Sequence, residues 1–256
     1  MKAPRSIFVV AWFTISAMAQ SSQSGPLELE RTIPLPKVEG RIDHMTVDLG
    51  NQRLFVAALE NNTVEVLDLG PGRRIYTIRG LNEPQGLVYL FELEKIVVAN
   101  GGDGACRYFD GRSFRPLNVV QLPDDADNVR YDAVSKRLYV GYGKGALGIL
   151  DAATGQRLGD IKLEGHPESF QLEKYSPRIF VNVPTAGHVA VVDREKRVVA
   201  AKWPVPQAAE NFPMALDEAD HRLFIGCRKP GVVLVLETVR GQVVARLNSA
   251  GDADDL

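Results

Sequence analysis

The chain has 256 residues, of which 45% are hydrophobic and 24% charged, with 30 Lys and Arg against 32 Asp and Glu. Without the first 19 residues, which include Lys2 and Arg5, 28 basic residues face 32 acidic ones, a net charge of −4. This mildly acidic balance argues against non-specific binding to nucleic acid or to anionic membranes, because both depend on clustered positive charge.

The first element along the chain is a predicted secretory signal. Lys2 and Arg5 precede the apolar run IFVVAWFTISAM, and small residues stand at Ala17 and Ala19. This pattern is typical of a cleavable signal peptide. We expect residues 1–19 to be removed, residues 20–26 to form a linker, and the mature protein to be periplasmic or secreted. No later stretch approaches the ~20 apolar residues of a membrane helix, so we expect no membrane span.

The next segment, LELERTIPLP, is predicted to be a strand without a repeat of its own. It is similar to RRIYTIRGL and GQRLGDIKL, which stand last in two of the repeats described next. We expect residues 27–37 to be a closing strand, which completes a sheet whose other strands are missing from the given sequence.

A repeat of about 42 residues then runs along the chain. The segments RLFVAAL, KIVVANG, RLYVGYG, RIFVNVP and RLFIGCR begin at Arg53, Lys95, Arg137, Arg178 and Arg222, with spacings of 42, 42, 41 and 44. A second set of segments ends at Asp68, Asp110, Asp151, Asp193 and Glu237 with nearly the same spacings. Self-similarity at such a fixed period indicates a repeat architecture.

Each repeat is predicted to form four short strands separated by clusters of Gly, Asn, Asp and Pro. The second strands are nearly continuous apolar runs, which indicates burial on both faces. Four-stranded sheets covered on both faces are typical of a β-propeller, in which each blade packs between its neighbours. The predicted fold is therefore all-β, with the domain at residues 27–256. The five complete blades are expected at about 42–80, 84–122, 125–163, 167–206 and 211–249.

The last residues, 252–256, read DADDL and repeat the pattern of DDADN at Asp124. We expect them to begin a sixth blade, and the given sequence to be a fragment of a longer gene product.

Carboxylates and arginines recur five residues apart around the first hairpin of several blades, as at Asp48 with Arg53 and Asp132 with Arg137. Asp accepts backbone hydrogen bonds at the start of a turn. Because residues that recur in every repeat serve the turn geometry, we interpret these positions as structural.

Polar side chains also recur in the loops that lead into the first strands, and these loops lie on one face of a propeller. In a closed ring these side chains would converge near the central funnel. The candidate ligand-binding residues there are His44, Asp127, Asn128, His166, Glu168 and Asn211. Further acids in the same loops are Asp43, Glu83, Asp124, Asp125, Glu210, Asp252, Asp254 and Asp255.

Converging carboxylates and histidines could hold a divalent cation or act as acid and base. The four candidate metal ligands are His44, Asp127, His166 and Glu168. Their scattered spacing lacks a tight motif such as H-x-x-x-H, so the sequence assigns no metal site and leaves the cofactor open. The alternative is that these side chains only solvate the funnel and cap the strands.

The loops between the second and third strands lie on the same face and differ from blade to blade. Variable loops on a repeated scaffold often carry recognition. The candidate contacts in them are Asn61, Asp103, Tyr142, Lys144, His188 and Arg228. The two cysteines, Cys106 and Cys227, fall in non-adjacent blades, beyond the ~7 Å Cα separation of a disulfide. We expect both to be buried free thiols.

The segments RLYVGYGKGALGILDAATGQ and RLFVAALENNTVEVLDL resemble the YVTN-type (YncE-like) secreted β-propeller repeat proteins. The resemblance covers residues 27–256 and implies a seven-bladed disc and a binding or scaffold role. Two functions therefore stay open. One is a binding or interaction module for a small molecule, a peptide or a protein, without an enzymatic activity. The other is a metal-dependent, lactonase-like hydrolase with its site in the acidic funnel.

Overall fold

The computed structural model describes residues 28–256, and the chain divides into two compact units, Met1–Thr32 and Ile33–Leu256. The predicted signal peptide and linker, residues 1–19 and 20–26, lie outside the described residues. The strands described below all belong to the second unit. Within residues 28–256, no helix is long and apolar enough to cross a membrane.

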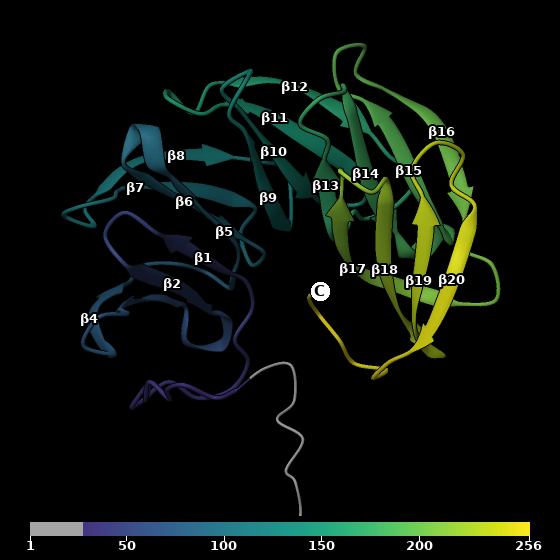
Figure 1. The fold of residues 1–256 in the computed structure, drawn as a ribbon. Helices are drawn as coiled ribbons and strands as arrows, with labels where there is room; N and C mark the ends of the chain where they lie inside the picture. Colours follow the sequence, from purple (N-terminus) through teal and green to yellow (C-terminus); the bar gives the residue numbers. More distant parts are fainter. Residues whose placement is uncertain (1–27) are drawn as a thin grey trace, which may run out of the picture. The chain divides into compact units, whose positions relative to one another are not determined.

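The described residues form twenty strands in five antiparallel sheets, called blades one to five in chain order (Figure 1). Blade one contains β1 (Met45–Asp48), β2 (Arg53–Ala58), β3 (Thr63–Asp68) and β4 (Arg73–Ile78). Blade two contains β5 (Pro84–Leu90), β6 (Lys95–Asn100), β7 (Ala105–Asp110) and β8 (Pro116–Gln121). Blade three contains β9 (Ala126–Asp132), β10 (Arg137–Tyr142), β11 (Ala146–Asp151) and β12 (Arg157–Lys162).

Blade four contains β13 (Phe170–Leu172), β14 (Arg178–Val183), β15 (His188–Asp193) and β16 (Val198–Pro204). Blade five contains β17 (Ala209–Asp217), β18 (Arg222–Lys229), β19 (Gly231–Glu237) and β20 (Val243–Asn248). Short 3-10 turns follow three of the strands, at Leu59–Asn61, Phe91–Leu93 and Pro184–Ala186. In every blade, strands that are consecutive in sequence are also hydrogen-bonded neighbours. This order confirms the predicted all-β fold of five four-stranded blades.

Alternate side chains of each blade pack against the blade before it and the blade after it. In β10, Leu138 and Val140 belong to an apolar cluster shared with blade two, whereas Tyr139 belongs to a cluster shared with blade four. Two further clusters join blade one to blade two and blade four to blade five. The inner strands must therefore be apolar on both faces, as their sequences indicate, because each buried Val, Leu or Ile contributes ~1.5–3 kcal/mol of transfer free energy.

This packing brings the first strands of successive blades together. Strand β5 contacts both β1 and β9, and β13 contacts both β9 and β17. In Figure 1 the fourth strands β8, β12, β16 and β20 lie on the outer side of these sheets. The loops that lead into the first strands are thereby gathered in one region of the second unit.

Some of the carboxylates and arginines that recur five residues apart pair with each other in the structure. Asp48 pairs with Arg53 at 2.6 Å, and Glu173 pairs with Arg178 at 2.6 Å. Asp132 instead pairs with Arg194 of blade four at 3.3 Å. This carboxylate therefore links two blades, in addition to accepting turn hydrogen bonds from Ser135.

Two segments that were expected to be strands are not strands in the structure. Residues 28–44 have no strand, although a closing strand was predicted at 27–37, and residues 252–256 have none either. Each sheet already has four strands from its own repeat, so none of them takes up this N-terminal segment. Part of the segment is held on blade one instead, because Arg74 donates to the Pro36 carbonyl at 3.1 Å and Glu39 exchanges two hydrogen bonds with Asn61.

Both cysteines are free and buried, as expected. Cys106 belongs to the cluster between blades two and three, and Cys227 to the cluster between blades four and five. Burial raises the pKa of the Cys106 thiol to about 12 and that of the Cys227 thiol to about 11. Because the thiolate is the reactive form, both side chains act as apolar core residues.

Candidate functional site

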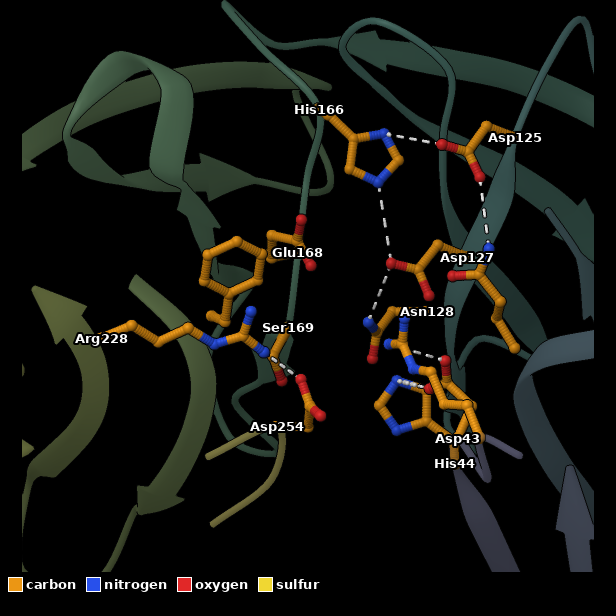
Figure 2. Close-up of a pocket in the computed structure, with 13 residues that line it drawn as sticks. Asp43, His44, Asp125, Asp127, Asn128, His166, Glu168, Ser169, Arg228 and Asp254 are labelled. Atoms are coloured by element: carbon orange, nitrogen blue, oxygen red, sulfur yellow. Dashed lines mark hydrogen bonds and ion pairs between the residues drawn. The ribbon is translucent and has the colours of Figure 1, made fainter. Parts of the chain in front are cut away.

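A polar cavity of about 250 Å³, called the funnel pocket below, lies where the loops of the five blades meet (Figure 2). It is lined by Arg41, Asp43, His44, Gln85, Asp125, Asp127, Asn128, His166, Glu168, Ser169, Phe212, Arg228 and Asp254. Five carboxyl groups, two guanidinium groups and two imidazoles are therefore gathered around one small space.

Backbone hydrogen bonds to the second strand of the same blade hold each of these loops. In blade one, the Asp43 N–H donates to the Ala57 carbonyl at 2.9 Å, and the Ala57 N–H donates to the His44 carbonyl at 3.0 Å. In blade four, the Glu168 N–H donates to the Asn182 carbonyl at 3.0 Å. The loops thus extend the hairpin ladder, which fixes the direction in which their side chains leave the backbone.

His166 stands between the two aspartates of blade three (Figure 2). Its Nδ1 is 2.6 Å from the Gly143 carbonyl and 3.6 Å from Asp125 Oδ2, and its Nε2 is 3.6 Å from Asp127 Oδ2. Burial disfavours the charged ring, but the interactions with Asp127, the Gly143 carbonyl and Asp125 outweigh burial and raise the pKa of His166 to about 9. The ring is therefore an imidazolium at neutral pH.

Glu168 lies on the other side of the pocket from Asp127 (Figure 2). Burial and the charge of Asp127 raise the pKa of the Glu168 carboxyl to about 7, against the opposing effects of His166 and Arg228. Burial also raises the pKa of Asp43 and of Asp125, and the charge of Asp127 adds to both shifts. Asp127 is thus a like charge that raises the pKa of three of the other four acids of the pocket, Asp43, Asp125 and Glu168.

Both arginines of the pocket already have carboxylate partners. Arg41 pairs with Asp43 at 3.1 Å, and Arg228 pairs with Asp254. The Arg228 guanidinium also lies 4.0 Å from the centre of the Phe212 ring, a cation–π contact. These pairs leave Asp125, Asp127 and Glu168 around the single imidazolium of His166.

Four polar atoms of the pocket are buried without a hydrogen-bond partner in the described part of the chain: Asp43 Oδ2, which has only its ion pair with Arg41, and Asn128 Oδ1, Ser169 Oγ and Arg228 Nε. Asn128 and Ser169 are each only 3% exposed. An unsatisfied buried polar group costs about 1–3 kcal/mol, and most such groups in folded proteins have a partner. These atoms therefore point to a molecule that completes the pocket.

The structure brings six of the predicted site residues into the pocket and leaves the other six elsewhere. His44, Asp127, Asn128, His166, Glu168 and Arg228 line it. Asn211 is buried and donates to Asn182 Oδ1 and to the His188 carbonyl, so its role is in the packing of blades four and five. His188 is itself buried, with Nδ1 3.2 Å from the Ala186 carbonyl.

The remaining variable-loop candidates have local partners. Asp103 pairs with Arg107 at 2.6 Å, and Asn61 bonds to the Glu39 backbone. Tyr142 donates to Asp160 at 3.1 Å, and Lys144 lies beside it in a separate open cavity.

Sequence reasoning named the acids of the pocket but missed Arg41, Gln85, Ser169 and Phe212 among its lining residues. A positional signal was present. Asp43, Gln85, Asp127, Glu168 and Phe212 are separated by 42, 42, 41 and 44 residues, the spacings of the repeat itself. Equivalent positions in a propeller lie at the same height on successive blades, so this column of the repeat predicts the lining regardless of residue type.

The four candidate metal ligands do not form a metal site. No three His, Cys, Asp or Glu side chains among residues 28–256 lie close enough to share one ion. The residues present therefore do not fit a metal held by three protein side chains.

Comparison with solved structures supports the architecture. Hydrazine synthase from Kuenenia stuttgartiensis, a β-propeller protein, superposes with a TM-score of 0.71 at 17% sequence identity, over 82% of this chain and 75% of that chain. The chain has a β-propeller fold. At this identity the likeness carries no information about activity. No protein-family model matches the sequence, and the curated proteins give no match.

The pKa of His166 tests the geometry of the pocket. We expect one histidine to titrate near pH 9 and Asp127→Asn to lower that pKa by at least about one unit, because the substitution removes the carboxylate beside Nε2. The measurement is an NMR titration of the imidazole nitrogens. Glu83→Gln, on the same face but exposed and outside the pocket, should leave the pKa unchanged.

The same shift has a consequence for stability. The folded state binds the His166 proton more tightly than the unfolded state does. The stabilisation that this proton gives the folded state is therefore fully present below about pH 6.5 and is lost as the pH rises through about 9. A His166 that titrates near 6.5 in the wild-type protein would contradict the arrangement.

Proposed function

We propose that this protein is an exported binding module of the YVTN repeat type that holds a small polar molecule in the funnel pocket. The observation that carries this proposal is the set of buried polar atoms without partners on Asn128, Ser169 and Arg228, which all line one cavity. Binding sites are concave and place a few fixed polar groups around the ligand. The resemblance of the repeats to YVTN-type proteins supports the proposed family. The signal peptide predicted from the N-terminal sequence supports export.

The size of the pocket favours a small molecule over a peptide or a protein as the ligand. Its 250 Å³ equals the volume of roughly eight water molecules at ~30 Å³ each. Phe212 adds the one aromatic surface among its lining residues. The lining thus offers hydrogen-bond donors, acceptors and charge to a compact polar ligand.

The Ser169→Ala variant should affect ligand affinity and protein stability in different ways. The Ser169 hydroxyl is buried without a partner, so we expect its removal to leave the free energy of unfolding unchanged or to raise it by about 1 kcal/mol. The affinity for a pocket ligand should fall at least fivefold, because the ligand loses that hydrogen bond. Ligands would be found by a thermal-shift screen of small polar molecules and their affinities measured by calorimetry.

Thr238→Val is the matched control. The Thr238 hydroxyl is also buried without a partner, but Thr238 follows β19 and does not line the pocket. This variant should gain similar stability and bind the ligand as the wild type does. Equal loss of affinity in both variants would contradict a site in the funnel pocket.

A hydrolase is the second candidate, and the acid–base properties of the pocket favour it. A carboxyl group with a pKa of about 7 beside an imidazolium is suited to proton transfer at neutral pH. Perturbed pKa values in a cleft are typical of catalytic sites, although ion-pair networks also produce them. The metal-dependent, lactonase-like form of this hypothesis has less support, because the donor set does not fit a metal.

Metal analysis distinguishes the two functions. For the binding module we expect less than one equivalent of bound divalent metal and the same melting temperature with and without chelator. Stoichiometric metal, together with a lower melting temperature in chelator, would favour the metal-dependent hydrolase, because a ligand that binds only the folded state stabilises it.

A further inference from the structure

The deep part of the funnel pocket has more negative charge than its own cations neutralise. Arg41 and Arg228 are committed to Asp43 and to Asp254. Among the lining residues, Asp125, Asp127 and Glu168 then share the His166 imidazolium, while the charge of Arg228 also acts on Glu168 and that of the buried Arg130 on Asp127. Carboxylates that share a buried space without enough positive charge disfavour one another's ionised forms, so an added cation is the partner that such a site lacks.

Hydrogen-bond acceptors without donors lie beside this charge. Asn128 Oδ1 and Ser169 Oγ are both buried and unpartnered, and the Asn128 amide group lies next to Asp127, with Nδ2 3.5 Å from its carboxylate. A primary ammonium group has three N–H donors, which can reach one or two carboxylates and a neutral acceptor at the same time. A metal ion would need closer convergence of ligands than these residues provide.

A third unpartnered atom indicates which chemical group the other end of the ligand should carry. Arg228 Nε is a donor, and it lies across the pocket from Asp127 (Figure 2). Because its guanidinium is held by Asp254 and by the Phe212 ring, this N–H has a fixed position. A ligand with a hydroxyl or carbonyl oxygen at that end would satisfy it.

Resting on the proposed function, we infer that the funnel pocket binds a small organic amine whose ammonium group lies between Asp127 and Glu168 and whose other end presents an acceptor oxygen to Arg228. The charge imbalance selects the amine, the unpartnered oxygens receive its N–H groups, and the volume limits it to a compact molecule. Neutral polyols and inorganic cations each meet only part of these requirements.

Two matched probe pairs test the inference: 5-aminopentan-1-ol against pentane-1,5-diol, and glucosamine against glucose. Each pair has the same size and differs in one amine in place of a hydroxyl group. Binding would be followed by the imidazole NMR signals of His166, which lines the pocket. We expect at least one amine to bind ten or more times as tightly as its alcohol partner.

Asp127→Asn should reduce the affinity for that amine at least tenfold and leave the affinity for its alcohol partner within twofold. Glu83→Gln removes the same charge from the same face outside the pocket and should leave both affinities unchanged. Amine affinity should also rise between pH 6 and pH 8, as Glu168 ionises among Asp125, Asp127, His166 and Arg228. Alcohol affinity should be independent of pH in this range.

The outcomes separate the two proposals. Alcohols that bind as tightly as the amines, or Ca²⁺ that displaces the amine and binds more tightly, would overturn the amine inference and leave the pocket as a binding site. An amine that binds equally well to the wild type, Asp127→Asn and Ser169→Ala would place binding outside the pocket and overturn both. Failure of all four probes, together with a different screened ligand that depends on Ser169, would overturn the amine inference alone.

Discussion

The face-to-face packing of adjacent sheets is the constraint on which the rest of this structure depends. Each middle strand presents one row of side chains to the preceding blade and the other row to the following blade, as Leu138 and Tyr139 do in β10. Since both faces are buried, both are mainly apolar, and a shift of one residue would reverse every contact. The same packing brings five strand-leading loops together, so the polar pocket depends on apolar contacts made elsewhere in the blades.

The repeat of the blades fixes where the lining residues of the pocket lie, and the differences in residue type between blades determine the chemistry of the pocket. One column of the repeat contributes Asp43, Gln85, Asp127, Glu168 and Phe212 at the spacings of the repeat, and all five line the pocket. A repeat scaffold would make a symmetrical lining if these positions were identical. Because they differ, Asp43, Asp125 and Asp127 lie on one side of the pocket, while Glu168, Ser169 and Arg228 lie on the other (Figure 2). The asymmetry gives a bound molecule one orientation.

The fold could be predicted from the sequence because its two signals, a 42-residue period and apolar middle strands, both arise from blade packing. Site residues could be predicted from the sequence mainly where their side chains are charged, as at Asp127 and Glu168. Gln85 and Phe212 carry no charge signal, and only their position in the repeat identifies them. The variable-loop candidates Asn61 and Asp103 lie outside the pocket, where Asn61 bonds to the Glu39 backbone and Asp103 to Arg107, pairings that residue type alone does not reveal.

The packing of neighbouring blades is tested most directly by a double-mutant cycle across the first interface. The rings of Phe55 in β2 and Tyr89 in β5 are stacked, with centroids 5.6 Å apart. Unfolding free energies of Phe55→Leu, Tyr89→Leu and the double variant should show a coupling of about 0.5–1.5 kcal/mol. The pair Phe55 and Phe170, in non-adjacent blades, should be additive. Additive effects for Phe55 and Tyr89 as well would contradict the face-to-face arrangement, and with it the convergence of loops that forms the pocket.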